Sequence, residues 1–223
     1  MKIIQFELLT NDLNSTQDFY AGKLGLPLLA RRADSYLFQV GWSSLLFRLT
    51  DQPVASYHFA FNVQPGTLDQ LVNRLPLSFL DAGQPGEPIA HFPDWKARAC
   101  YFQDPNDNVV ELIERRDAAY AGALFSPIQG ISEVGLVTDD VPSLSRQLTT
   151  AYNLEQFDKT LPKEDFNAIG DDFGLFILSQ TARKWLFTDI PALAQHSRVL
   201  FTDHYNVPHL LTTSAQDEVL VSL

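Results

Sequence analysis

The sequence predicts an α+β protein built from four similar strand–helix–strand units. Three observations support this prediction: apolar and polar residues alternate as in strands, capping residues precede helical apolar stripes, and the first half of the chain repeats in the second. The chain has 223 residues, 45% of them hydrophobic, which is enough to bury one large core or two small ones. We therefore expect an ordinary globular protein.

The first unit opens with a strand at residues 3–10, in which polar and apolar side chains face opposite sides. A helix should follow, because Asp12 or Asn14 can cap it and Gly25 can end it in a left-handed conformation. Three further strands complete the unit, at residues 27–30, 36–40 and 44–49.

The second unit, residues 57–114, repeats this order of elements. It has a strand at residues 57–63, a helix capped by Thr67, a proline-rich loop, and strands around Cys100 and Glu111.

The opening pattern returns in the second half of the chain. Asp140 is expected to cap a helix there, as Asp12 does in the first half, and Pro142 lies in the first turn of that helix. The last unit, residues 197–223, has an opening and a closing strand but too few residues between them for a useful helix. We expect a first module at 1–116, a linker at 117–130, and a second module at 131–223 that is shortened in its last unit.

Charge and cysteine content exclude several classes of function. The net charge is -11, so nucleic acid and anionic membrane surfaces should be repelled. The single cysteine, Cys100, excludes an internal disulfide framework, and we read it as a small buried residue. The sequence does not open with a signal peptide and has no apolar run long enough to span a bilayer, so a soluble, cytoplasmic protein is expected.

Several motifs resemble those of one protein superfamily. They are an L-L-T-N-D-L opening followed by F-Y and L-G, the strand H-F-A-F-N-V, and the segment F-Q-D-P-N-D-N-V-V-E-L. In these motifs the chain resembles the glyoxalase, bleomycin-resistance and extradiol-dioxygenase superfamily, whose members are also called vicinal oxygen chelate proteins. The resemblance covers nearly all of the first half and residues 131–178.

The resemblance implies a fold and a metal site. Tandem βαβββ units would pair into half-open, eight-stranded barrel modules with flanking helices, and a divalent metal would lie in the cup of a barrel. The family positions for its ligands fall on Gln5, His58 and Glu111, while the position of a fourth ligand falls on Phe47, which cannot bind a metal. If the units exchange partners instead of pairing in chain order, Glu133 takes the place of Gln5; chain-order pairing is expected.

The residues themselves give a physical reason for such a site. Glu111 lies between apolar residues of a strand, and a buried carboxylate is costly unless a positive charge neutralises it. Imidazole, carboxylate and amide oxygen suit zinc, nickel, manganese or iron. The alternative is that Glu111 pairs with Arg98 or Arg48, and that His58 is a core histidine whose hydrogen bonds are satisfied.

Other polar residues are weaker candidates for the site. Glu7 shares a predicted strand face with Gln5 and is a candidate general base, although it could equally pair with an arginine. Arg31 and Arg32 could meet an anionic substrate or form a solvated turn. In the second half the three ligand positions fall on Glu133, Arg198 and Leu220, so no metal is expected there. In the second half, His204 and His209 are expected to be surface or packing histidines, and His196 has no visible partner.

Two functions follow from these expectations. One is a metal-dependent lyase or isomerase acting on a small oxygen-rich substrate, in which Glu111 or Glu7 moves a proton, with extradiol-type oxygen chemistry as a lower-ranked variant. The other is a binding protein that sequesters a small molecule without catalysis. The expected partner is a small molecule in both cases, and a homodimer is compatible with the resemblance.

Overall fold

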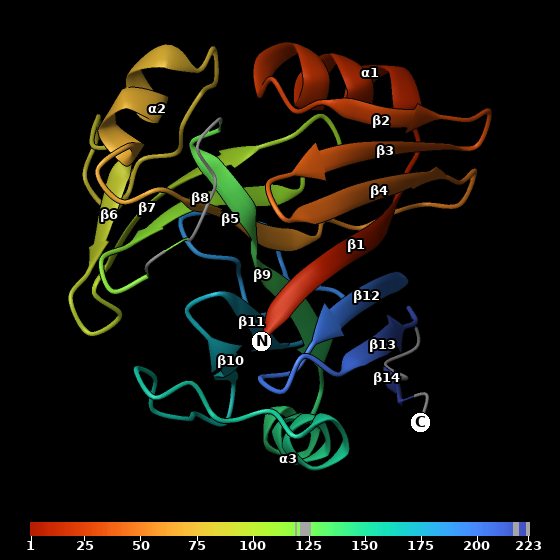
Figure 1. Ribbon diagram of the computed structural model, residues 1–223, viewed down its shortest axis with the longest axis vertical. Helices are drawn as coiled ribbons and strands as arrows, with labels where there is room; N and C mark the ends of the chain where they lie inside the picture. The colour runs from red at the N-terminus through yellow and green to blue at the C-terminus, as the bar shows by residue number, and fades with distance from the viewer. Residues whose placement is uncertain (119, 121–125, 216–218, 222–223) are drawn as a thin grey trace.

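Two seven-stranded sheets make up most of the molecule (Figure 1). The computed structural model describes residues 1–118, 120, 126–215 and 219–221. In spatial order the first sheet consists of β14 (Val219–Val221), β13 (Pro208–Thr213), β12 (Ser197–Thr202), β1 (Lys2–Thr10), β4 (Ser43–Leu49), β3 (Ser35–Val40) and β2 (Leu28–Arg31). The second consists of β10 (Phe166–Asp171), β11 (Gly174–Gln180), β9 (Ile128–Thr138), β5 (His58–Val63), β8 (Val109–Arg115), β7 (Ala97–Gln103) and β6 (Ile89–Phe92).

The helices begin and end largely where the capping residues predict. Asp12 caps α1 (Leu13–Gln17), which continues as the π-helical segment η1 (Asp18–Lys23), and Gly25 follows with a φ of 72°. Asp140 caps α3 (Val141–Tyr152) by accepting a hydrogen bond from the Ser143 amide at 2.8 Å. The structure confirms these predictions. They could be made from the sequence because a helix cap depends on only a few neighbouring residues.

The cap of α2 (Leu68–Arg74) differs from the prediction. Thr67 precedes the helix but makes no side-chain cap, and its hydroxyl donates to the Gln64 carbonyl oxygen at 2.6 Å. The Glu114 carboxylate caps the helix instead, by accepting hydrogen bonds from the amides of Gly66 and Leu68 at 3.0 and 3.1 Å. A cap supplied by a distant strand leaves no local signal in the sequence.

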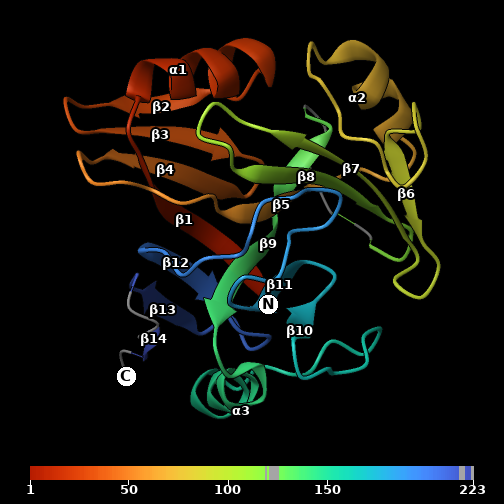
Figure 2. The same cartoon turned by 180° about the vertical axis from the view of Figure 1, so that it is seen from behind.

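The core lies between the two sheets, where β1 and β9 cross near the centre of the molecule (Figures 1 and 2). Phe6 of β1 packs edge-on against Phe59 of β5, with ring centroids 5.6 Å apart. The sheets approach so closely that a Cβ atom on Gly130 would lie 2.1 Å from the Trp42 ring. Glycine is therefore required at this crossing.

The units pair by exchange, so the expected chain-order pairing is wrong. Strands of the first unit pair with those of the last, and strands of the second unit pair with those of the third. Both edges of β1 are occupied, by β4 and β12, so β1 cannot lie beside β5. In the predicted 117–130 linker, residues 128–130 belong to β9, and residues 119 and 121–125 lie outside the described residues.

The α+β class and the mixed, curled sheets are confirmed. Each sheet has seven strands in the described part of the chain, where the family pattern implies eight, because the third and fourth units supply three strands each. None of the described helices has the length and apolar character needed to cross a membrane.

Candidate metal centre

Three strands of the second sheet bring two glutamates and a histidine together. Ala60 on β5 pairs with Glu111 on β8 on one side and with Glu133 on β9 on the other. His58 precedes Ala60 by two residues, so its side chain emerges on the same face of the sheet. The small Ala60 side chain leaves room above it for the three larger ones.

The ligand atoms of His58, Glu111 and Glu133, named here the triad, all lie within 4.8 Å of one another. His58 Nε2 is 3.8 Å from Glu111 Oε2 and 3.9 Å from Glu133 Oε2. Both distances are too long for a hydrogen bond. They are also below the roughly 4.2 Å that separates two atoms on opposite sides of a cation with bonds of about 2.1 Å. The donor set and its spacing therefore suit a divalent metal ion.

The His58 imidazole is oriented by the backbone. Its Nδ1 lies 3.0 Å from the Val109 carbonyl oxygen. Because a carbonyl oxygen can only accept, Nδ1 carries a proton, and in the neutral imidazole Nε2 then keeps a lone pair on the side of the two carboxylates. A histidine held in this way by a second hydrogen bond is typical of metal ligands.

The two carboxylates differ in electrostatic environment. Burial raises the pKa of Glu111 well above its usual range, and the nearby Glu133 charge raises it further, against opposing effects of Arg115 and a hydrogen bond from Tyr101. Glu133 instead forms an ion pair with Arg115 and is 4% exposed. One negative charge of the triad is thus compensated within the protein, and the other is not.

Arg115 is completely buried behind the triad. Its guanidinium lies 5.5 Å from the centroid of the Trp95 ring and 5.7 Å from that of Phe157, so it is held between aromatic faces. Asp172 adds a second carboxylate at 3.7 Å, and Lys159 contacts Asp172 at 2.6 Å. The positive charge next to Glu133 is therefore fixed in position.

A cavity of about 110 Å³ opens onto the triad. Its lining is aromatic and aliphatic apart from the triad and Arg183, and consists of His58, Phe92, Trp95, Tyr101, Glu111, Ile113, Glu133, Phe166, Ile177, Arg183, Trp185 and Leu186. A small molecule bound here would place one end against the triad and its body against apolar walls.

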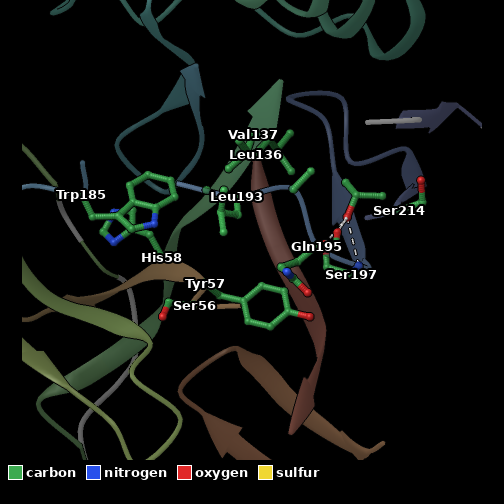
Figure 3. Close-up of a pocket in the computed structure, with 13 residues that line it drawn as sticks. Ser56, Tyr57, His58, Leu136, Val137, Trp185, Leu193, Gln195, Ser197 and Ser214 are labelled. Atoms are coloured by element: carbon green, nitrogen blue, oxygen red, sulfur yellow. Dashed lines mark hydrogen bonds between the residues drawn. The ribbon is translucent and has the colours of Figure 1, made fainter. Parts of the chain in front are cut away.

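Trp185 covers His58 from the segment that joins β11 to β12. The two rings lie 5.0 Å apart at 35°. A second, smaller cavity of about 20 Å³ borders both residues and is lined also by Tyr57, Gln195 and Ser197 (Figure 3). Its volume suits about one water molecule.

Two of the three residues expected in the metal site from chain-order pairing come together, and the third does not. His58 and Glu111 belong to the triad. Gln5 lies on β1 in the other sheet and lines a different cavity, with Arg32 and Arg48. Glu133, the residue expected if the units exchange, takes its place, because β9 rather than β1 lies beside β5.

Glu7 also lies away from the triad. Its carboxylate accepts a hydrogen bond from Arg48 Nε at 2.9 Å, which is the arginine pairing weighed as its alternative role. Neither arginine suggested as a partner for Glu111 contacts it: Arg48 binds Glu7, and Arg98 binds Glu114 and Asp69.

Three further residues with predicted roles lie outside the triad. His209 contacts Asp203 at 3.2 Å and packs on Tyr152, and Cys100 is buried. The side chain of Leu220 lies outside the described residues.

Sequence reasoning missed Arg115. A signal for it was present in the sequence. Side chains two residues apart share one face of a strand, so Arg115 lies on the same face of β8 as Glu111 and Ile113. Trp185 and Arg183 left no such signal, because they come from an irregular segment whose course depends on both sheets.

The chain is similar in sequence to the uncharacterised protein YraH of Bacillus subtilis strain 168. The two are 29% identical over 124 residues, which is 50% of this chain and 97% of YraH. No protein-family model matches the chain.

Two solved structures share the fold along almost the whole chain. A proposed dioxygenase from Bacillus subtilis superposes with a TM-score of 0.62 at 16% identity, covering 95% of this chain and 84% of its own. A mutant glyoxalase I from Zea mays superposes with a TM-score of 0.55 at 14% identity, covering 97% and 93%. At these identities the likeness concerns the fold.

Proposed function

Because the chain has the fold of the glyoxalase, bleomycin-resistance and dioxygenase superfamily, we propose that it is a divalent-metal-dependent enzyme with His58, Glu111 and Glu133 as the protein ligands. One observation carries the proposal. With Nδ1 bonded to the Val109 carbonyl oxygen, His58 Nε2 lies 3.8 and 3.9 Å from two buried carboxylates, too far to hydrogen-bond to either. A divalent cation would satisfy all three groups at once.

The donor set indicates which metals and which chemistry fit. One imidazole and two carboxylates suit zinc, nickel, manganese or iron, and three protein ligands leave positions for substrate or water. A bound cation would act as a Lewis acid on adjacent oxygens of a small substrate, as in lyase or isomerase reactions.

The chain's own groups have distinct roles in this proposal. The Tyr101 hydroxyl stays protonated, because burial raises its pKa well above its usual range, and it donates a hydrogen bond to Glu111. Without a bound cation Glu111 can hold a proton on its carboxylate, since burial favours its neutral form, and this proton would leave when Glu111 binds the metal. Trp185 and the aromatic wall of the cavity would limit the contact of a bound substrate with bulk water.

Two other functions rank below this one. An extradiol-type dioxygenase is suggested by the description of the Bacillus subtilis structure, but non-haem iron oxygenases ordinarily use two histidines and one carboxylate. A binding protein without metal is favoured by the Arg115 ion pair, which already compensates one carboxylate, and by the apolar cavity.

Metal analysis of protein purified without a histidine tag tests the proposal. We expect about one divalent ion per chain, and at least about a 100-fold loss of metal affinity in Glu133→Ala, because a direct ligand should matter more than its supporting contacts. Gln5→Ala is the matched control, since Gln5 occupies the expected position in chain-order pairing and should bind metal as the native protein does.

Two results would count against the metal centre. Absence of metal from both native and reconstituted protein would leave the binding-protein function. Loss of metal in Gln5→Ala but not in Glu133→Ala would mean that the ligand set is wrong.

A further inference from the structure

One strand pair of the first sheet repeats the register of a strand pair in the metal centre, with different side chains. Gln5 on β1 pairs with Leu200 on β12, as Glu133 on β9 pairs with Ala60 on β5. Arg198 precedes Leu200 by two residues, as His58 precedes Ala60. Gln5 and Arg198 therefore stand at the positions of Glu133 and His58, and a site equivalent to the triad cannot bind a cation.

A cavity of about 130 Å³ lies on this sheet. It is named here the arginine cup, and its lining consists of Gln5, Ala30, Arg32, Ser35, Leu37, Leu46 and Arg48. Its polar lining residues offer hydrogen-bond donors from two guanidinium groups and an amide, and its apolar lining comes from Ala30 and two leucines. No carboxylate lines it.

A buried carboxylate behind the cup fixes one of its arginines. Glu7 is 6% exposed, and it accepts a hydrogen bond from Arg48 Nε at 2.9 Å. Arg198 reaches the other oxygen of Glu7 at 3.7 Å, and Asp34 lies 3.6 Å from Arg48 Nη1. The Arg48 guanidinium is thus oriented in advance, while 40% of its side chain remains exposed.

Two of the remaining donors of the cup are uncommitted, while the Ser35 hydroxyl donates to the Asp34 carboxylate at 3.0 Å. Among the described residues, the Arg32 guanidinium forms no hydrogen bond or ion pair, and the Gln5 amide nitrogen donates to no group. The neighbouring Arg31 differs, because its Nε donates to the Tyr36 hydroxyl at 2.8 Å. Free donors around a partly apolar hollow suit an anion with an apolar body.

We propose that the arginine cup is a second binding site, which takes a small organic carboxylate. The carboxylate would accept hydrogen bonds from Arg32 and Arg48, whose planar guanidinium groups match its geometry. Its apolar part would contact Leu37 and Leu46, and Gln5 would donate to a remaining oxygen. This site is independent of the metal centre, because it lies on the other sheet and needs no cation.

The test uses benzoate as the probe and isothermal titration calorimetry on the full chain. A chelator is present throughout, so that benzoate has no metal to bind in the triad. We expect saturable binding of one benzoate per chain, and no binding of the neutral analogue benzamide.

Arg32→Gln is the decisive variant, because it removes a free guanidinium and leaves the Glu7–Arg48 pair intact. It should weaken benzoate binding by about tenfold or more, the effect expected for one charge-assisted hydrogen bond. Arg48→Gln should weaken binding at least as much. Arg74→Gln, an exposed arginine on α2, and Glu111→Gln in the triad should both bind benzoate as the native protein does.

Three outcomes would overturn the proposal: no saturable binding of benzoate by the native protein, unchanged affinity in Arg32→Gln, or lost affinity in Glu111→Gln. None of them bears on metal binding, which is measured separately without the chelator.

Discussion

The two sheets place opposite charges on the same backbone plan. In the second sheet the Glu133 and His58 side chains, on the neighbouring strands β9 and β5, are 4% and 8% exposed. In the first sheet the same register positions carry Gln5 and Arg198, and Arg198 is 45% exposed. One site is closed and acidic, and the other is open and basic.

The difference in burial decides what each site can hold. The Trp185 segment and the aromatic wall bury the triad, so its uncompensated carboxylate has little contact with bulk water and favours either a proton or a metal ion. The arginines of the first sheet keep contact with water, so they can remain charged without a bound partner. The fold supplies the position, and the depth of the site determines the charge that it tolerates.

Removing the buried arginine should disturb the closed site most. Arg115→Met leaves Glu133 without its partner, and breaking a buried ion pair costs about 3–5 kcal/mol of the free energy of unfolding. Urea unfolding in the presence of a chelator measures this loss. The double variant Arg115→Met with Glu133→Gln is the control, because it removes both charges and should recover a large part of the stability. If the double variant is as unstable as the single one, packing around Arg115 and not its charge holds the site together.

The pH dependence of stability should also distinguish the closed site. The pKa of Glu111 is raised in the folded protein, so its contribution to stability is complete below the unfolded pKa of about 4.3 and is lost as pH rises toward the folded value. In metal-free protein, stability should fall by up to about 1.4 kcal/mol per pH unit over this range relative to Glu111→Gln.

Urea unfolding of both proteins between pH 5 and pH 8 gives this comparison, and groups common to both cancel in the difference. Parallel curves for the native protein and the variant would show that Glu111 carries no such shift.

The smallest effect is expected in the open site. Arg198 is 45% exposed and lies 3.7 Å from Glu7, so Arg198→Gln should change the free energy of unfolding by no more than about 0.5 kcal/mol. The same urea experiment measures it. A loss near that of Arg115→Met would contradict the contrast between a closed and an open site.

The local parts of the fold could be predicted from the sequence, and the pairing of units could not. Asp12, Asp140 and Gly25 mark helix ends through contacts with residues only a few positions away. The choice between β1 and β9 as neighbour of β5 has no such signal, because both are apolar, alternating strands that could lie against it. The observed pairing of β5 with β9 depends on contacts across the whole molecule.

The same limit applied to the candidate site. His58 and Glu111 were identified from motifs within one segment, so their proximity followed from the pattern of the second unit. Glu133 was identified only as an alternative, because its place beside Ala60 depends on the exchange of units. Arg115 was missed because its partner lies across that exchange, on β9.

The exchanged pairing also governs the order in which the molecule can be assembled. During synthesis β1 emerges first, yet it must wait for β12 before its sheet is complete, while β5 finds β9 much sooner along the chain. The sheet of the triad can therefore form while the other sheet still has an open edge, and contacts of such long sequence separation slow folding. A break of the chain between β8 and β9 would accordingly not release a self-contained module, because each fragment would keep strands in both sheets.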